Sequence, residues 1–245
     1  MTPARLERAE LPELACYLTQ QLPSGIKDDY LSHEYDVFAV DQSALKAILD
    51  DNDVITWTRP VEFPCVSEAS CSTIKELAGR HGWNVNTYGP QWTEMYCVER
   101  ENLKLINPPK GITVAELSSK DAEVVNSRWK FNSGRQSMSV FKFWIENYPS
   151  VALFDAEGQL VAWELTTHFG IMGRLYVMPE HRGKGYAKYI ISTLAQKCFA
   201  KDIKPVANLE LCNYRSIRLH QKMGFTKVSS SPLTFIKTEK KNCAS

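Results

Sequence analysis

The stretch that decides the fold is Leu175-Tyr-Val-Met-Pro-Glu-His-Arg-Gly-Lys-Gly-Tyr-Ala187. It sets Gly183 and Gly185 between a strand-like apolar run and the start of a long helix-like run. Glycine lets the main chain approach a ligand closely, and the free N–H groups of a helix's first turn bind anions. The stretch therefore predicts a diphosphate site, against the alternative of a tight turn that binds nothing.

Other phosphate-binding loops fit this stretch less well. The chain has no Gly-x-x-x-x-Gly-Lys-Ser/Thr run, and Gly183-Lys-Gly185 lacks the third glycine of a dinucleotide fold.

Further strands and helices are expected on both sides of the loop. A helix with one apolar face follows from about Gly185, and other helices are expected from 118 toward 129, over 139–147 and over 214–222. Strands are expected over 112–117, 151–154, 160–167, 174–177 and 206–211, with one or two more from Phe225.

The first hundred residues predict a mixed α and β region. Its expected elements are an opening helix that includes Leu6 to Leu18, strands over 36–41 and 53–58, a helix through Leu45 and Ile48, and a helix over 72–80. Asn107-Pro-Pro-Lys-Gly111 concentrates residues that helices and central strands tolerate poorly. We therefore expect two domains, 1–108 and 109–245.

Two motifs give the chain a family resemblance. Arg182-x-x-Gly185-x-Ala187, preceded by Val177-x-Pro179, matches the Arg/Gln-x-x-Gly-x-Gly/Ala motif of the GNAT superfamily of acyl-coenzyme A N-acyltransferases. Asn213-x-x-Ser216-x-x-Leu219-His220-x-Lys222-x-Gly224-Phe225 resembles the helix that flanks the pantetheine arm in that family. The resemblance implies an α/β (α+β) protein whose C-terminal half has the GNAT fold, a mixed and mostly antiparallel twisted sheet flanked by helices. A smaller or degenerate GNAT-like α/β domain is expected before it.

Further similarities point to the glycine N-acyltransferase-like branch. They are carried by Trp129, by 141–150 and by Val161-Ala-Trp163. The branch implies transfer of an acyl group from acetyl-CoA or another acyl-CoA to glycine or another small amine, by direct attack and without a metal. A protein Nα- or lysine acetyltransferase and a non-catalytic acyl-CoA sensor are the alternatives.

The resemblance assigns the co-substrate to one strand, one loop and one helix. It implies that free backbone groups of the strand pair with pantetheine, and that Arg182 and Lys184 support phosphates. The cofactor-binding residues expected are Leu175, Tyr176, Val177, Arg182, Gly183, Lys184, Gly185, Tyr186, Ala187, Asn213 and Ser216. Tyr176, Tyr186 and Tyr189 are core residues in the alternative interpretation.

Catalysis requires a polarised thioester carbonyl, a proton for the thiolate and a neutral amine. The resemblance implies that the Val177 backbone N–H polarises the thioester carbonyl. It also places His220 where many GNATs have a tyrosine that acts as the acid. His220 is either that acid or a packed, hydrogen-bonded histidine. The branch's glutamate base aligns with Ile171, so Glu164 and His168 are the candidate substitutes, followed by Glu180, His181 and a water relay.

Composition excludes strong charge-driven partners. Lys plus Arg number 29 against 28 for Asp plus Glu, so we expect neither nucleic acid nor membrane as a partner. The 7 cysteines form no CxxC pair and predict reduced thiols. We expect a cytoplasmic monomer or homodimer, with mitochondria as the alternative location.

Overall fold

The computed structural model describes residues 16–20, 33–39, 42–50, 55, 57–97, 99–130, 135–167, 170–227 and 232–240. The chain forms two compact units, unit 1 from Met1–Thr93 with Ser230–Ser245 and unit 2 from Glu94–Ser229. These units differ from the predicted division after residue 108 in two respects. Residues 94–108 belong to unit 2, and the C-terminal strand belongs to unit 1.

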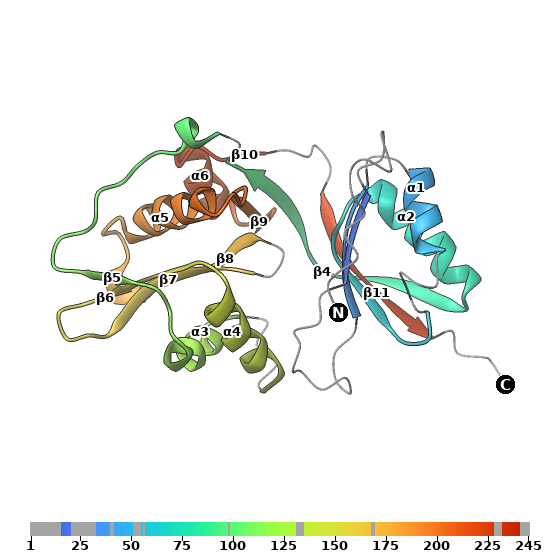
Figure 1. Cartoon of the computed structure of the whole chain (residues 1–245), viewed down its shortest axis with the longest axis horizontal. Helices are drawn as coiled ribbons and strands as arrows, with labels where there is room; N and C mark the ends of the chain where they lie inside the picture. The colour runs from blue at the N-terminus through green and yellow to red at the C-terminus, as the bar shows by residue number, and fades with distance from the viewer. Residues whose placement is uncertain are drawn as a thin grey trace. The chain divides into compact units, whose positions relative to one another are not determined.

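Unit 1 combines a sheet with two helices (Figure 1). The strand order is β1 (Cys16–Gln20), β2 (His33–Ala39), β3 (Val61–Val66), β11 (Leu233–Lys240) and β4 (Trp83–Tyr96). β2 and β3 run parallel, whereas β11 runs antiparallel to β3 and β4. The helices α1 (Gln42–Leu49) and α2 (Glu68–Arg80) bury Leu45, Leu49, Ile74 and Leu77 in the unit's core with Phe63 and Ile236.

Several predictions for unit 1 are wrong. Residues 16–20 form β1, so Leu18 lies in a strand instead of the expected helix, while residues before 16 lie outside the described part. Strand pairing with β2 has overridden the helical spacing there. Trp57 and Thr58, expected in a strand, lie in a turn, where the Trp57 indole N–H donates to the Leu49 carbonyl over 3.1 Å.

Unit 2 contains a mixed sheet between two pairs of helices (Figure 1). From β4 the order is β9 (Val206–Glu210), β8 (Ile171–Val177), β7 (Leu160–Thr166), β6 (Ser150–Phe154) and β5 (Thr113–Ala115), and β10 (Thr226–Lys227) pairs with the end of β4. The pairs β5–β6, β6–β7 and β7–β8 are antiparallel, whereas β8 and β9 run parallel. The expected mixed, mostly antiparallel sheet flanked by helices is confirmed.

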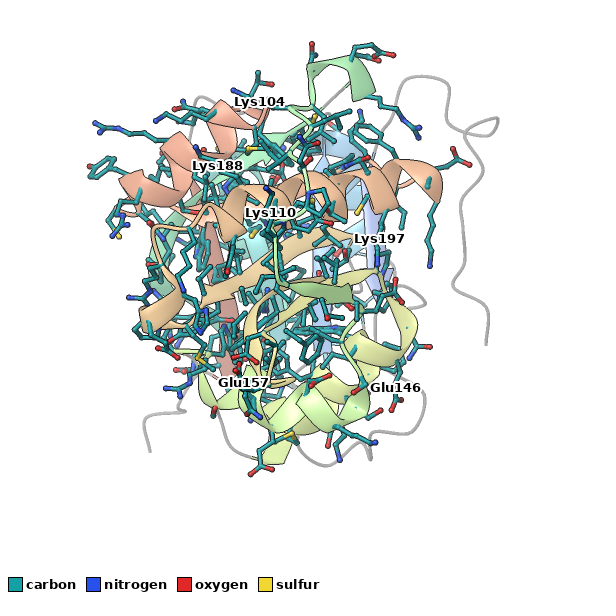
Figure 2. All side chains as sticks on the ribbon, turned by 90° about the vertical axis from the view of Figure 1, so that its left-hand side faces the viewer. Lys104, Lys110, Glu146, Glu157, Lys188 and Lys197 are labelled. Carbon is teal, nitrogen blue, oxygen red and sulfur yellow. The ribbon has the colours of Figure 1, made fainter. Side chains whose placement is uncertain are left out.

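Each face of this sheet has its own core. Helices α3 (Ala122–Ser127) and α4 (Arg135–Asn147) cover one face, where Phe141 and Trp144 pack with Trp163 and Leu165. Helices α5 (Tyr186–Ala200) and α6 (Tyr214–Lys222) cover the other, where the core includes Ile190, Leu194, Met172 and Phe225. Figure 2 shows α5, with Lys188 and Lys197, above the strands and α4, with Glu146, below them.

Short 3-10 helices connect these elements: Arg100–Asn102, Ser119–Asp121 and Pro179–His181. Ser118 and Asp121 form a capping box, as their positions before α3 predict. No helix within the described ranges is long and apolar enough to cross a bilayer.

Candidate acyl-donor site

Strands β8 and β9 separate after a short ladder. The ladder pairs Ile171 with Val206 and Met172 with Ala207, and over the fully described range 170–210 it extends no further. Beyond these two pairs the strands diverge, and within the described range their facing edges no longer bond to each other. Such an edge can hydrogen-bond to an extended ligand as an added strand would.

A bulge in β8 sets the direction of its last residues. Arg174 and Leu175 together oppose Glu164, and Arg174 has a left-handed φ of 58°. Further on, the Met178 N–H donates to the Val161 carbonyl over 2.8 Å, so it points toward β7. Because successive N–H groups of a strand point to opposite sides, the Val177 N–H points toward the gap.

The loop before α5 presents free backbone donors. Gly183, Lys184, Gly185, Tyr186 and Ala187 have no acceptor for their N–H groups within the described part of the chain, whereas the Arg182 N–H donates to the Pro179 carbonyl over 3.3 Å. Gly185 caps α5, so the last of these donors lie at the positive end of the helix dipole. Oriented amides at a helix start form a site for an anion such as a diphosphate.

The geometry also explains both glycines. Gly183 and Gly185 have φ values of 79° and 83°, which side-chain-bearing residues rarely adopt. A Cβ at either position would meet nothing within 4 Å. The main chain is therefore shaped by glycine and borders open space.

The basic residues of the loop are exposed, and each contacts a neighbour. The Arg182 Nε donates to the Val177 carbonyl over 3.1 Å, and its guanidinium lies 5.7 Å from the centre of the Tyr176 ring. Lys184 Nζ lies 3.5 Å from His181 Nδ1. Arg182 thus fixes the end of β8, while Lys184 adds positive charge to the turn.

The other expected binding residues divide between gap and core. Leu175, Val177 and Tyr189 are half-buried and pack against the α5-side core. Tyr186 is buried in that core, and its ring stacks on His181 at 6.2 Å. Tyr176 stacks on Trp163 at 5.1 Å on the other face, and Ala187 is half-buried at the start of α5.

Asn213 and Ser216 build the start of α6. The Asn213 side-chain oxygen accepts from the Ser216 N–H over 3.2 Å, which is an N-cap interaction. The Ser216 carbonyl in turn lies 2.9 Å from His220 Nδ1. The predicted contact of Asn213 with pantetheine stays a prediction.

His220 lies inside the core. It is buried, and the Phe225 ring packs edge-on to its ring at 5.3 Å. Because the Ser216 carbonyl can only accept, Nδ1 carries the proton, and Nε2 is buried without a recorded partner among the described residues. Burial lowers the pKa of His220, which favours neutral imidazole and hence the packed-histidine interpretation over the proton donor.

Glu164 is also buried, on the α5 face of β7. The neighbouring Thr166, two residues on, has its hydroxyl 3.8 Å from Cys198 Sγ of α5. Burial, and to a smaller extent the charge of Glu164, raises the pKa of Cys198 to about 11. Burial raises the pKa of Glu164 to about 8. Its carboxyl is therefore mostly protonated at neutral pH, and it lies on the face that α5 covers.

The remaining candidate bases are dispersed. His168 lies outside the described residues, and Ile171, at the start of β8, has no carboxylate to offer. Glu180 is exposed and His181 half-buried in the 3-10 helix before the phosphate loop. Within the described ranges, no group of three or more His, Cys, Asp or Glu side chains is arranged to hold a metal ion.

Two features of the site carry no local sequence signal. The Arg174 guanidinium contacts the rings of Trp129 and Trp144, which lie far from Arg174 in the sequence. Lys130 forms an ion pair with Glu210, so the segment after α3 is linked to the end of β9. Only the fold brings these residues together.

Comparisons with known proteins agree with this geometry. Residues 150–232 match the family model described as FR47-like protein. Human glycine N-acyltransferase is 24% identical over 217 residues, which cover 81% of this chain and 71% of that protein. An acetyltransferase of L-methionine sulfoximine and L-methionine sulfone from Salmonella typhimurium is 39% identical over 66 residues, 26% of this chain and 37% of that enzyme.

Solved structures share the fold. The structure of a Drosophila protein has a TM-score of 0.72 at 20% identity and covers 93% of this chain and 75% of its own. A tandem GNAT protein from the clavulanic acid biosynthesis pathway has a TM-score of 0.53 at 11% identity and covers 91% of this chain and 78% of its own.

Proposed function

Because the chain belongs to the GNAT superfamily, in its glycine N-acyltransferase-like branch, and is an acyl-CoA-dependent N-acyltransferase, we propose that it acylates the amine of glycine or another small amino acid. The observation that carries the proposal is the turn from Gly183 to Ala187, whose amides are free beside the gap between β8 and β9. The turn has donors for a diphosphate, and the gap has strand edges for a pantetheine arm.

The backbone of β8 would take part in the reaction directly. The Val177 N–H points into the gap, where it can donate to the thioester oxygen as negative charge develops. Arg182 holds the Val177 carbonyl and so orients the same stretch of backbone. In the transfer, the amine nitrogen bonds to the acyl carbon, the carbon–sulfur bond breaks, and the proton lost by nitrogen balances the one gained by sulfur.

Proton removal from the amine would proceed through water. Glu164 is mostly protonated near pH 7 and faces α5, so it is poorly placed as a base. His220, buried and neutral, has its one proton on Nδ1, directed at the Ser216 carbonyl. A neutral amine needs a base only after it has attacked, when its nitrogen is acidic.

One observation supports a small acceptor over a protein one. Glycine and the two methionine derivatives named for the relatives are all α-amino acids.

Calorimetry followed by an amine screen tests the proposal. The protein is titrated with acetyl-CoA, benzoyl-CoA and longer acyl-CoAs, and CoA release is then measured with glycine and other amines. Gly185→Glu is the control, because its carboxylate would enter the open space that the diphosphate is proposed to fill. We expect binding by the wild-type protein and little heat from the variant. Equal heats from both proteins would count against the site.

A further inference from the structure

Arg174 occupies a costly backbone position. It is the bulge residue of β8, with a φ of 58°, a conformation that is unfavourable for a side-chain-bearing residue and that glycine adopts freely. Residues retained in such conformations cluster at functional sites. The arginine side chain at this bulge therefore suggests a use beyond the turn itself.

Two tryptophans hold the Arg174 side chain. Its guanidinium carbon lies 5.2 Å from the ring centre of Trp129 and 4.8 Å from that of Trp144. Ring contacts of this kind engage the charge of the guanidinium and restrict its motion. The planar group matches a carboxylate, which accepts two parallel N–H bonds. Arg174 is thus a preorganised cation in an aromatic setting.

The bulge directs Arg174 to the face from which an acceptor would approach. Leu175 and Val177 pack on the α5 side of β8, whereas Arg174 and Tyr176 contact aromatic residues of the α3 and α4 side. On the α5 side of the sheet, the hydrophobic core fills the space. The turn from Gly183 to Ala187, where the diphosphate would bind, leads into α5. An amine that attacks a thioester held by the Val177 N–H would therefore approach from the side on which Arg174 lies.

The spacing along β8 suits an amino acid. Arg174 precedes Val177 by three residues, about 10 Å of strand. An arginine side chain and a bound α-amino acid together can span that distance. The amine would then face the thioester while the carboxylate stays on the guanidinium.

We propose that Arg174, which contacts Trp129 and Trp144, binds the carboxylate of an α-amino acid acceptor. The inference rests on the proposed function, since it names the part of the same site that selects the acceptor. It assigns a chemical class: amines that carry a free carboxylate are preferred to amines that lack one.

Paired acceptors and paired variants test this assignment. The kcat/KM of the wild-type protein is measured with glycine and with glycinamide, which lacks the negative charge, and the measurements are repeated with Arg174→Gln and Arg174→Lys. We expect glycine to be preferred by about 100-fold in the wild type, because a charged hydrogen-bond pair is lost with the amide. Arg174→Gln should lower the kcat/KM for glycine by about 100-fold and change the kcat/KM for glycinamide by only a few-fold. Arg174→Lys should restore part of the preference for glycine.

The test uses the ratio of the kcat/KM values for glycine and glycinamide. This ratio is independent of folding, because any inactive fraction of a variant lowers both values equally. An unchanged ratio in Arg174→Gln, or equal use of glycine and glycinamide by the wild type, would overturn the assignment and leave the proposed function intact. A wild-type protein that binds acetyl-CoA but releases no CoA with any amine would overturn both. Binding of acetyl-CoA should be the same in all three proteins.

Discussion

The turn before α5 and the interior beneath α5 and α6 both contain residues of the family motifs, yet they are built in opposite ways. In the turn, backbone donors are free and a Cβ at Gly185 would meet open space. In the interior, a Cβ at Gly224 would lie 1.9 Å from the Asn102 carbonyl oxygen, and His220 is buried beside Phe225. The same residue type, glycine, borders open space in one region and packs against the chain's own backbone in the other.

This difference separates binding residues from structural ones. Glu164 and His220, two of the titratable residues predicted for catalysis, both lie in the packed interior, and burial shifts each pKa toward the neutral form. The groups that face the gap are backbone amides and the Arg182 side chain. We therefore expect the chemistry of this site to depend on main-chain geometry more than on an acid–base pair.

Gly224→Ala should give the largest effect. The added Cβ would collide with the backbone of Asn102 and Leu103, in a conformation with a φ of 95°, so we expect the free energy of unfolding to fall by about 3 to 5 kcal/mol. Denaturant titration measures this loss. Gly183→Ala is the matched control: its Cβ enters open space, and it should cost only about 1 to 2 kcal/mol. Similar losses in both variants would contradict the contrast between the regions.

Glu164→Gln should change how stability depends on pH. The carboxyl has a pKa of about 8 in the folded protein against 4.5 as its ordinary value, so the unfolded chain releases the proton first and stability falls as pH rises from 4.5 to 8. Relative to the wild type, the Gln variant should gain about 3 kcal/mol between pH 4.5 and pH 7. Unfolding titrations at several pH values check this, and parallel curves would show that Glu164 ionises normally.

His220→Ala should affect stability more than turnover. Removing a buried ring that packs on Phe225 is expected to cost about 2 kcal/mol. Because the neutral imidazole has no proton on Nε2, we expect kcat per folded molecule to change by less than tenfold. Loss of a catalytic acid would lower kcat by roughly 10² to 10⁴-fold, and a fall of that size with unchanged acetyl-CoA affinity would return His220 to the mechanism.

The sequence predicts those parts of the site that depend on neighbours along the chain. Gly183, Gly185 and the helix that follows them lie within one continuous stretch, so their geometry follows from local backbone preferences. The N-cap role of Asn213 also depends on a residue only three positions away. The turn and the N-cap can therefore both be predicted from the sequence alone.

Features that depend on distant segments could not be predicted. Arg174 meets Trp129 and Trp144 only because the sheet packs against α3 and α4. The burial of His220 depends in the same way on the assembled core. The long strand β4 was missed because Gly89 and Pro90 interrupt its pattern, and because its partner β11 lies far away in the sequence, near the C-terminus.

Amide hydrogen exchange at the turn tests the central claim most directly. In the protein alone, the amides of Gly183 to Ala187 should exchange rapidly, because none has an acceptor within the described residues. Saturating acetyl-CoA should slow their exchange and leave that of Gly158, in the β6–β7 turn, unchanged. Slow exchange before acetyl-CoA is added, or the same rapid exchange at saturation, would contradict a diphosphate site at this turn.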